Sequence, residues 1–219
     1  PYITADNRAM LEDTDDIVEG IKLVKKYMNL STVIIGIEDN KPQAIAKLQA
    51  AVADIEGASV KALKAQYPQG GEKVLIYECT GKIVPEGKLP SDVGCVVMNV
   101  SSIAFVAKYM RTGMPLITKR LTVDGDAIAE PKNVEVAIGT SFSDVIDFCG
   151  GFKTEPKKII MGGPMMGFAV PTINYPVLKN NNAILAFSAA KTAEAEKPET
   201  PCIRCARCVN ACPFSLMPA

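Results

Sequence analysis

The fold class is decided by the stretch Thr14-Asp-Asp-Ile17-Val-Glu-Gly-Ile21-Lys-Leu-Val24-Lys-Lys-Tyr-Met28-Asn-Leu-Ser-Thr32-Val-Ile-Ile-Gly-Ile37. Its first half carries apolar residues at helical spacing behind a polar helix start, Thr14-Asp-Asp. Its second half, residues 32–37, is a short β-branched run bounded by polar positions. The stretch therefore predicts a helix followed by a buried strand.

The same order recurs along the first half of the chain. Asn40 and Pro42 suit a helix start, residues 45–55 carry one apolar face, and residues 59–63 read as a second strand. A third strand is expected at 95–100, followed by a helix with apolar residues at 103, 106 and 110. Strands that alternate with helices predict a parallel α/β sheet, so residues 1–113 are expected to form a Rossmann-like domain.

After residue 113 the apolar period changes to two. Strands are expected at 121–123 and 134–138 around the turn Asp124-Gly-Asp126, then a helix at 143–149 and strands at 158–161 and 183–187. This order predicts a small α+β domain over 114–190. The run 162–167, Gly-Gly-Pro-Met-Met-Gly, lacks the G-x-G-x-x-G order of a nucleotide loop and is interpreted as a tight corner between strands.

Charge and composition exclude several classes of protein. The chain has 219 residues, with 24 Lys+Arg against 24 Asp+Glu, so net charge gives no reason to expect a nucleic-acid partner. It contains no histidine, which removes Ser-His-Asp catalysis and imidazole ligation of metals. No apolar run is long enough to span a bilayer. The chain opens at Pro1 without an initiator Met and is expected to be a piece of something longer.

Four of the seven cysteines stand close together near the end of the chain, after a segment of linker composition at 191–201. They form the run Cys202-x-x-Cys205-x-x-Cys208-x-x-x-Cys212-Pro213, the spacing of bacterial ferredoxins. Structural zinc is the rival interpretation, but zinc favours two C-x2-C pairs separated by a longer loop. Residues 202–219 are therefore predicted to be an iron–sulfur segment.

The run supplies only part of a two-cluster site. In two-cluster ferredoxins the first three cysteines bind one cluster and the fourth binds the other. No second run follows, so the chain by itself is expected to bind [4Fe-4S] clusters poorly. The remaining cysteines, Cys79, Cys95 and Cys149, lie in apolar segments and are expected to be small core residues.

Two polar segments in the first half are candidates for a ligand site. At Tyr67-Pro-Gln-Gly70-Gly71-Glu72 paired glycines would let backbone amides approach a phosphate or a flavin, although such a pair is more often just a turn. At Asn99-Val-Ser-Ser102 a strand is expected to give way to a helix, so the polar side chains either face a ligand or cap the helix.

Taken together, these segments resemble the C subunits of the Rnf (Rsx) electron-transport complex, which are related to the NADH- and FMN-binding subunit of respiratory complex I. The resemblance covers nearly the whole chain. Besides the cysteines, it rests on these stretches: 1–6, 10–12, 67–72, 80–85, 89–94, 99–100 and 162–167.

The resemblance implies a fold and a set of cofactor-binding residues. It implies a flavin- and NADH-binding Rossmann-like domain whose N-terminal part precedes residue 1, a soluble-ligand-binding β-grasp domain, and the first half of a two-[4Fe-4S] ferredoxin-like domain. The residues that it places at FMN and NAD(H) are Tyr67, Gly70, Gly71, Glu72, Asn99 and Ser102.

The resemblance also implies a function for the full-length protein. It would be a peripheral subunit at the cytoplasmic face of the cell membrane that passes electrons between NAD(H) and ferredoxin, with FMN and the clusters supplying the redox chemistry. Its partners would be other Rnf subunits, including membrane-embedded ones, and a ferredoxin-type redox protein. No side chain is predicted to be catalytic. A soluble relative such as a cobalamin reductase and a non-catalytic adaptor are the alternatives.

Overall fold

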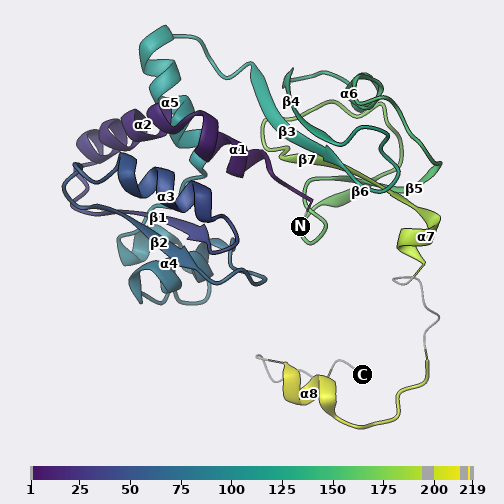
Figure 1. Ribbon diagram of the computed structural model, residues 1–219. Coiled ribbons are helices and arrows are strands. Elements are labelled where there is room, and N and C mark those ends of the chain that lie inside the picture. Colours follow the sequence, from purple (N-terminus) through teal and green to yellow (C-terminus); the bar gives the residue numbers. More distant parts are fainter. Residues whose placement is uncertain (1, 194–199, 213–216, 218–219) are drawn as a thin grey trace.

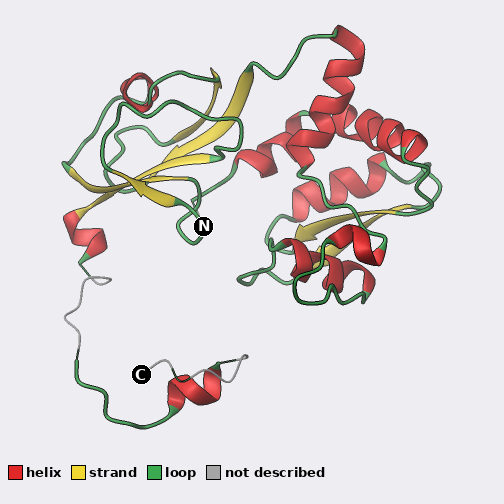
Figure 2. Cartoon of the chain, turned by 180° about the vertical axis from the view of Figure 1, so that it is seen from behind, coloured by secondary structure: helices red, strands yellow, loops and turns green. Residues whose placement is uncertain are grey.

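A computed structural model describes residues 2–193, 200–212 and 217. It contains two packed modules joined side by side, with the first helix lying between them (Figure 1). Seen from behind, one module is mainly helical and the other is mainly sheet (Figure 2).

The first module is a helical layer packed on a small parallel sheet. In it β1 and β2 pair in parallel, from Val33 opposite Ala58 to Glu38 opposite Leu63. Its elements are, in order, α1 (Ala5–Glu12), α2 (Thr14–Tyr27), β1 (Val33–Glu38), α3 (Pro42–Ala51), β2 (Ala58–Leu63), α4 (Glu72–Thr80), the 3-10 helix η1 (Pro90–Val93) and α5 (Val100–Thr112).

The core of this module forms where α2, α3 and α5 meet β1. Ile17 and Ile21 of α2, Leu48 of α3 and Ile37 of β1 are all buried there. Ile17 and Ile21 of the predicted apolar stripe therefore mark the buried face of α2, as expected for an amphipathic helix, whereas Met28, just past the end of α2, is 48% exposed. Helix α4 packs on β1 separately: a Cβ on Gly36 would meet the side chains of Leu75 and Cys79.

Helices α2 and α5 cross at unusually close range. Gly20 lies in the middle of α2, and a Cβ on it would stand 2.1 Å from the carbonyl oxygen of Ile103 in α5. Glycine costs helix stability at an interior position. Here it is explained by the close approach, because no side chain fits between the two backbones.

The prediction of a strand at 95–100 is wrong. Residues 95–99 pair with no strand among the described residues, and α5 begins directly at Val100. The side chains there alternate in burial, with Val96 55% exposed, so the segment is apolar without entering a sheet. The expected helices at 17–28, 42–55 and 103–110 are confirmed as α2, α3 and α5, within a few residues at their ends.

The second module is a five-stranded sheet with one helix against it. The strands run in the order β4-β3-β7-β5-β6, with β3 and β7 parallel and the other pairs antiparallel. The elements are β3 (Thr118–Asp124), β4 (Lys132–Ala137), α6 (Phe142–Phe148), β5 (Pro156–Met161), β6 (Phe168–Val170) and β7 (Ala183–Ser188).

This module confirms the expected strand, hairpin and helix order and adds one strand, β6. Its core gathers Leu121 and Val123 of β3, Phe142 and Ile146 of α6 and Ile184 of β7, all buried. Residues 162–167 join β5 to β6, which makes them the corner of an antiparallel hairpin. The helix α7 (Ala189–Thr192) follows β7, so the predicted linker 191–201 overlaps its last residues, and residues 194–199 lie outside the described residues.

The two modules meet along the start of α1. The backbone N–H groups of Thr4 and Ala5 both donate to the hydroxyl of Thr122 in β3, each at 3.0 Å. The ring of Tyr2 stands edge-on to Phe187 of β7, with centroids 5.2 Å apart. In the part of the chain that the structure describes, none of the helices is long and apolar enough to cross a membrane.

Candidate functional site

The predicted metal ligands lie on a short exposed segment. Cys202, Cys205 and Cys208 are exposed, Cys208 lies in the short helix α8 (Arg207–Ala211), and Cys212 ends that helix. The backbone N–H of Arg204 donates to the sulfur of Cys202 at 3.3 Å. Pro213 lies outside the described residues.

The chemistry of these donors fits an iron–sulfur cluster. Four thiols at ligand spacing are present, and one sulfur already accepts an amide hydrogen bond of the kind that tunes cluster potentials. Within the described ranges, however, no three Cys, Asp or Glu side chains are gathered closely enough to hold an ion. The cysteines that would bind a cluster are thus identified by their spacing and not by a preformed cage.

The turn at 67–71 leads directly into α4. It closes with backbone hydrogen bonds from Gln69 N–H to Gln66 C=O at 2.8 Å and from Gly71 N–H to Pro68 C=O at 2.7 Å. The peptide bond between Tyr67 and Pro68 is cis. Tyr67 is 61% exposed, and a Cβ on Gly70 would meet nothing within 4 Å. The turn therefore presents an aromatic ring and open backbone to solvent.

Two features of this turn are suited to an anionic or carbonyl-bearing ligand. No side chain caps the N-terminus of α4, which begins at Glu72 after Gly71, so the first amides of the helix lack that partner. The side chain of Gln69 is 3% exposed, and its Nε2 has no hydrogen-bond partner among the described residues. A buried donor without a partner costs free energy, which a ligand oxygen would offset.

Asn99 lies at the N-terminus of α5, where the structure confirms its capping role. Its side-chain oxygen accepts from the backbone N–H of Ser101 at 2.8 Å. Ser102 belongs to the first turn of the same helix, where its backbone N–H donates to the carbonyl of Asn99 at 3.0 Å. Capping uses only the oxygen of the Asn99 amide group, and the amide nitrogen, Nδ2, donates to a different residue.

Asp6 is the neighbour that sequence reasoning missed. Asn99 Nδ2 donates to one carboxylate oxygen of Asp6 at 2.9 Å, and the Ser101 hydroxyl donates to the other at 3.1 Å. Burial lowers the pKa of the half-buried Lys119 of β3, and the nearby Asp6 carboxylate opposes that shift only in part. No local sequence pattern signals a contact between residues 93 positions apart.

The turn at 67–72 and Asn99 lie at the starts of two helices that pack differently. Helix α4 packs on β1 and η1, whereas α5 packs on α2 and α1. The turn also contacts the second module: the Tyr67 hydroxyl donates to the sulfur of Met166, in the corner 162–167, at 3.7 Å.

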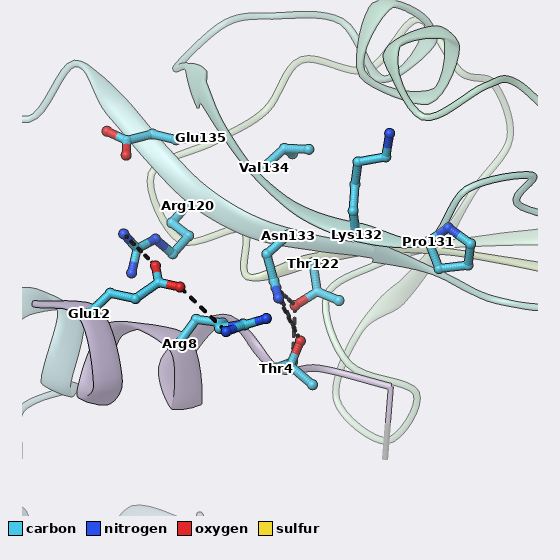
Figure 3. A pocket seen from close by; sticks show the side chains of 10 residues that line it. All are labelled: Thr4, Arg8, Glu12, Arg120, Thr122, Pro131, Lys132, Asn133, Val134 and Glu135. Atoms are coloured by element: carbon cyan, nitrogen blue, oxygen red, sulfur yellow. Dashed lines mark hydrogen bonds and ion pairs between the residues drawn. The ribbon is translucent and has the colours of Figure 1, made fainter. Parts of the chain in front are cut away.

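A cleft of about 560 Å³ runs along the seam between α1 and the β3–β4 hairpin (Figure 3). Charged groups that line it have partners in the protein. Glu12 lies between Arg120, at 3.5 Å, and Arg8, at 3.6 Å. Lys132 is paired with Glu130 at 2.8 Å. The cleft is thus a polar contact surface between the modules, where these ion pairs leave little charge to attract a ligand.

Comparison with known proteins matches both modules to families. Residues 1–108 match the Nuo51 FMN-binding domain, and residues 120–169 match the SLBB domain. The fold is also similar to a chain of an NAD+-reducing [NiFe]-hydrogenase, with a TM-score of 0.71 at 16% sequence identity over 89% of this chain and 40% of that chain.

Three curated relatives match the entire chain. It is 48% identical to the C subunit of the proton-translocating ferredoxin:NAD(+) oxidoreductase complex of Clostridium ljungdahlii, covering 47% of that protein. It is 45% identical to the C subunit of the Na(+)-translocating complex of Acetobacterium woodii, covering 49%, and 40% identical to that of the ion-translocating oxidoreductase complex of Yersinia pseudotuberculosis, covering 31%. The chain thus spans half or less of these relatives. The resemblance inferred from the sequence is confirmed, and the chain belongs to the family of C subunits of ion-translocating ferredoxin:NAD(+) oxidoreductase (Rnf) complexes.

Proposed function

We propose that the chain is part of an electron-transfer subunit that connects NAD(H) to iron–sulfur clusters in a membrane-associated complex. The observation that carries this proposal is the 48% identity along the whole chain to a ferredoxin:NAD(+) oxidoreductase subunit. The match of residues 1–108 to an FMN-binding domain supports the cofactor. Bound FMN would exchange a hydride with NAD(H) and single electrons with the clusters.

The residues proposed to hold FMN are those of the turn and of the α5 start: Tyr67, Gly70, Gly71, Glu72, Asn99 and Ser102. The uncapped amides of α4 and the unpaired Gln69 Nε2 would supply donors for flavin oxygens. The exposed ring of Tyr67 would offer an apolar face to the ring system. Open backbone at Gly70 would allow close approach of the ligand.

Cys202, Cys205 and Cys208 are proposed to hold one [4Fe-4S] cluster, and Cys212 to bind a second. In this arrangement residues 1–113 form the flavin domain, 114–190 a β-grasp domain, 191–201 a linker and 202–219 the start of the ferredoxin-like domain. The subunit would lie at the cytoplasmic face of the membrane and contact membrane-embedded subunits of its complex and a ferredoxin-type redox protein.

The test uses the full-length protein, purified without oxygen. FMN binding is followed by quenching of flavin fluorescence, and clusters by iron and sulfide content and EPR. Cys205→Ser is expected to lose a four-iron signal, whereas the matched variant Cys95→Ser, at a partly buried cysteine outside the run, retains it. A protein that binds neither iron nor FMN would contradict the proposal and favour a non-catalytic adaptor. Reduction of cobalamin by the full-length protein without its complex would favour a soluble reductase.

A further inference from the structure

Asp6 receives hydrogen bonds from two side chains of another helix. It lies in the first turn of α1, and its two carboxylate oxygens accept from Asn99 and Ser101 at the start of α5. Hydrogen bonds to a charged acceptor are shorter and stronger than neutral ones. Asp6 therefore holds the start of α5 at two points.

The consequence for Asn99 is a fixed amide orientation. Its oxygen accepts from Ser101 N–H and its nitrogen donates to Asp6, so both ends of the group have a partner. One N–H and one lone pair of the amide remain for a ligand. Without Asp6 only the capping bond would remain, and the side chain would lose the contact that directs its nitrogen.

The second module helps to set the position of Asp6, alongside the packing of α1 on α3 and α5. The Thr122 hydroxyl accepts the N–H groups of Thr4 and Ala5, immediately before Asp6, and donates to Asn133 of β4 at 2.8 Å. Asn133 in turn donates to the Thr4 hydroxyl at 2.8 Å. Thr122 and Ala5 are both buried, so the hydrogen bond between them is shielded from water. The start of α1 is thus attached to the β3–β4 hairpin by a closed set of hydrogen bonds (Figure 3).

We propose that Asp6 is a positioning residue for the flavin site: it orients Asn99, and the β3–β4 hairpin, through Thr122, places Asp6. The inference rests on the proposed function, since it requires Asn99 to contact FMN. It gives Thr122 and Asn133 of the sheet module an indirect role in that site, by way of Asp6.

The test measures FMN affinity and the visible circular dichroism of bound flavin in the full-length protein. Asp6→Asn keeps the shape but leaves one acceptor oxygen for two donors, so the Kd for FMN is expected to rise about tenfold, as for loss of one charge-assisted bond. The dichroism of the bound flavin should change with it. Asp15→Asn is the matched control, because Asp15 lies exposed in the first turn of α2.

Thr122 provides a second, independent pair of variants. Thr122→Val removes the hydroxyl at constant shape and is expected to raise the Kd about threefold, the effect of a neutral hydrogen bond. Thr122→Ser keeps the hydroxyl and should restore the native Kd and dichroism. Thermal melts establish whether each variant is folded. If Asp6→Asn does not fold, the comparison of Thr122→Val with Thr122→Ser tests the inference instead.

The outcomes separate the inference from the proposed function. If Asn99→Ala weakens FMN binding while Asp6→Asn and Thr122→Val bind like the native protein, the positioning role is overturned and the flavin site stands. If the native protein binds no FMN, both fall. Weakening in Asn99→Ala, Asp6→Asn and Thr122→Val, with Asp15→Asn and Thr122→Ser unchanged, supports the inference.

Discussion

Replacing Gly20 with alanine tests the packing of the first module, because this glycine is where α2 and α5 come closest. The added Cβ would stand 2.1 Å from the oxygen and 2.8 Å from the carbon of the Ile103 carbonyl. Those atoms belong to the backbone of α5 and cannot rotate away. One of the two helices must therefore move by about 1 Å to restore van der Waals contact.

Two opposing effects set the size of the change. Alanine gains about 1 kcal/mol over glycine inside a helix. Overpacking a well-packed contact costs about 1–3 kcal/mol, and a backbone clash lies at the upper end of that range. We expect Gly20→Ala to lower the free energy of unfolding by about 2 kcal/mol, the difference between the largest cost and the propensity gain.

Urea denaturation followed by far-UV circular dichroism measures this change. With a slope of about 2 kcal/mol per molar urea, the midpoint should fall by about 1 M. Lys22, exposed in the same helix, provides the control: comparing Lys22→Ala with Lys22→Gly gives the propensity difference in α2 without the clash. A Gly20→Ala protein as stable as the native chain, or more stable, would refute the close-packing argument.

Three further results are expected. Asp126 accepts hydrogen bonds from the hydroxyl and, at 3.0 Å, from the N–H of Ser188, and these bonds, the hydroxyl foremost, lower the pKa of its carboxyl. Asp126→Asn should therefore reduce the urea midpoint at pH 7, and the difference in midpoint between variant and native protein should vanish as the pH falls through that lowered pKa, below about 4. A difference in midpoint that does not change with pH would contradict this. Burial raises the pKa of the thiol of the fully buried Cys149. Iodoacetamide at about pH 8 should therefore label the exposed Cys205 first and Cys149 only after denaturation, as measured by peptide mass spectrometry. Equal labelling rates for the two cysteines would contradict the burial of Cys149. Phe142→Ala empties a fully buried position and should cost about 3–5 kcal/mol in urea denaturation, whereas a loss under about 1 kcal/mol would mean that α6 is not packed as described.

The sequence alone predicts those helices and strands whose apolar residues recur at a regular spacing. The faces of α2 and α3 and the hairpin of β3 and β4 follow from periodicity, which depends only on neighbouring residues. The run 95–100 forms no strand, contrary to its pattern, because a short β-branched segment has the same sequence features whether or not a partner strand is available. Whether a segment pairs with another strand depends on the rest of the chain, so the local sequence cannot predict it.

Among the elements that the sequence analysis does not predict, α1 and β6 show two different reasons. Helix α1 buries Ala5, Ala9 and Met10, and small alanines give little hydrophobic signal. Strand β6 is three residues long and lies at the sheet edge, too short for any alternation to show. Both matter for the architecture, and α1 also carries Asp6.

The candidate site was predictable only in part. Asn99 was recognised as either a ligand-facing or a capping residue, and the structure shows how one amide can cap with its oxygen while its nitrogen is directed by Asp6. The partner itself could not be found, because the contact depends on how α1 is docked between two modules. That the turn at 67–72 receives FMN stays a prediction, which the binding measurement on the full-length protein decides.

The position of β7 in the middle of its sheet has a consequence for biosynthesis. It joins β3 on one side and β5 on the other, yet it is the last of the five strands to be made. Until Ser188 has left the ribosome, the β3–β4 and β5–β6 hairpins have no strand to connect them and expose apolar faces. Such late, long-range pairing folds slowly and leaves intermediates prone to aggregate. A nascent chain of this module is therefore expected to depend on chaperones until its final strand is inserted.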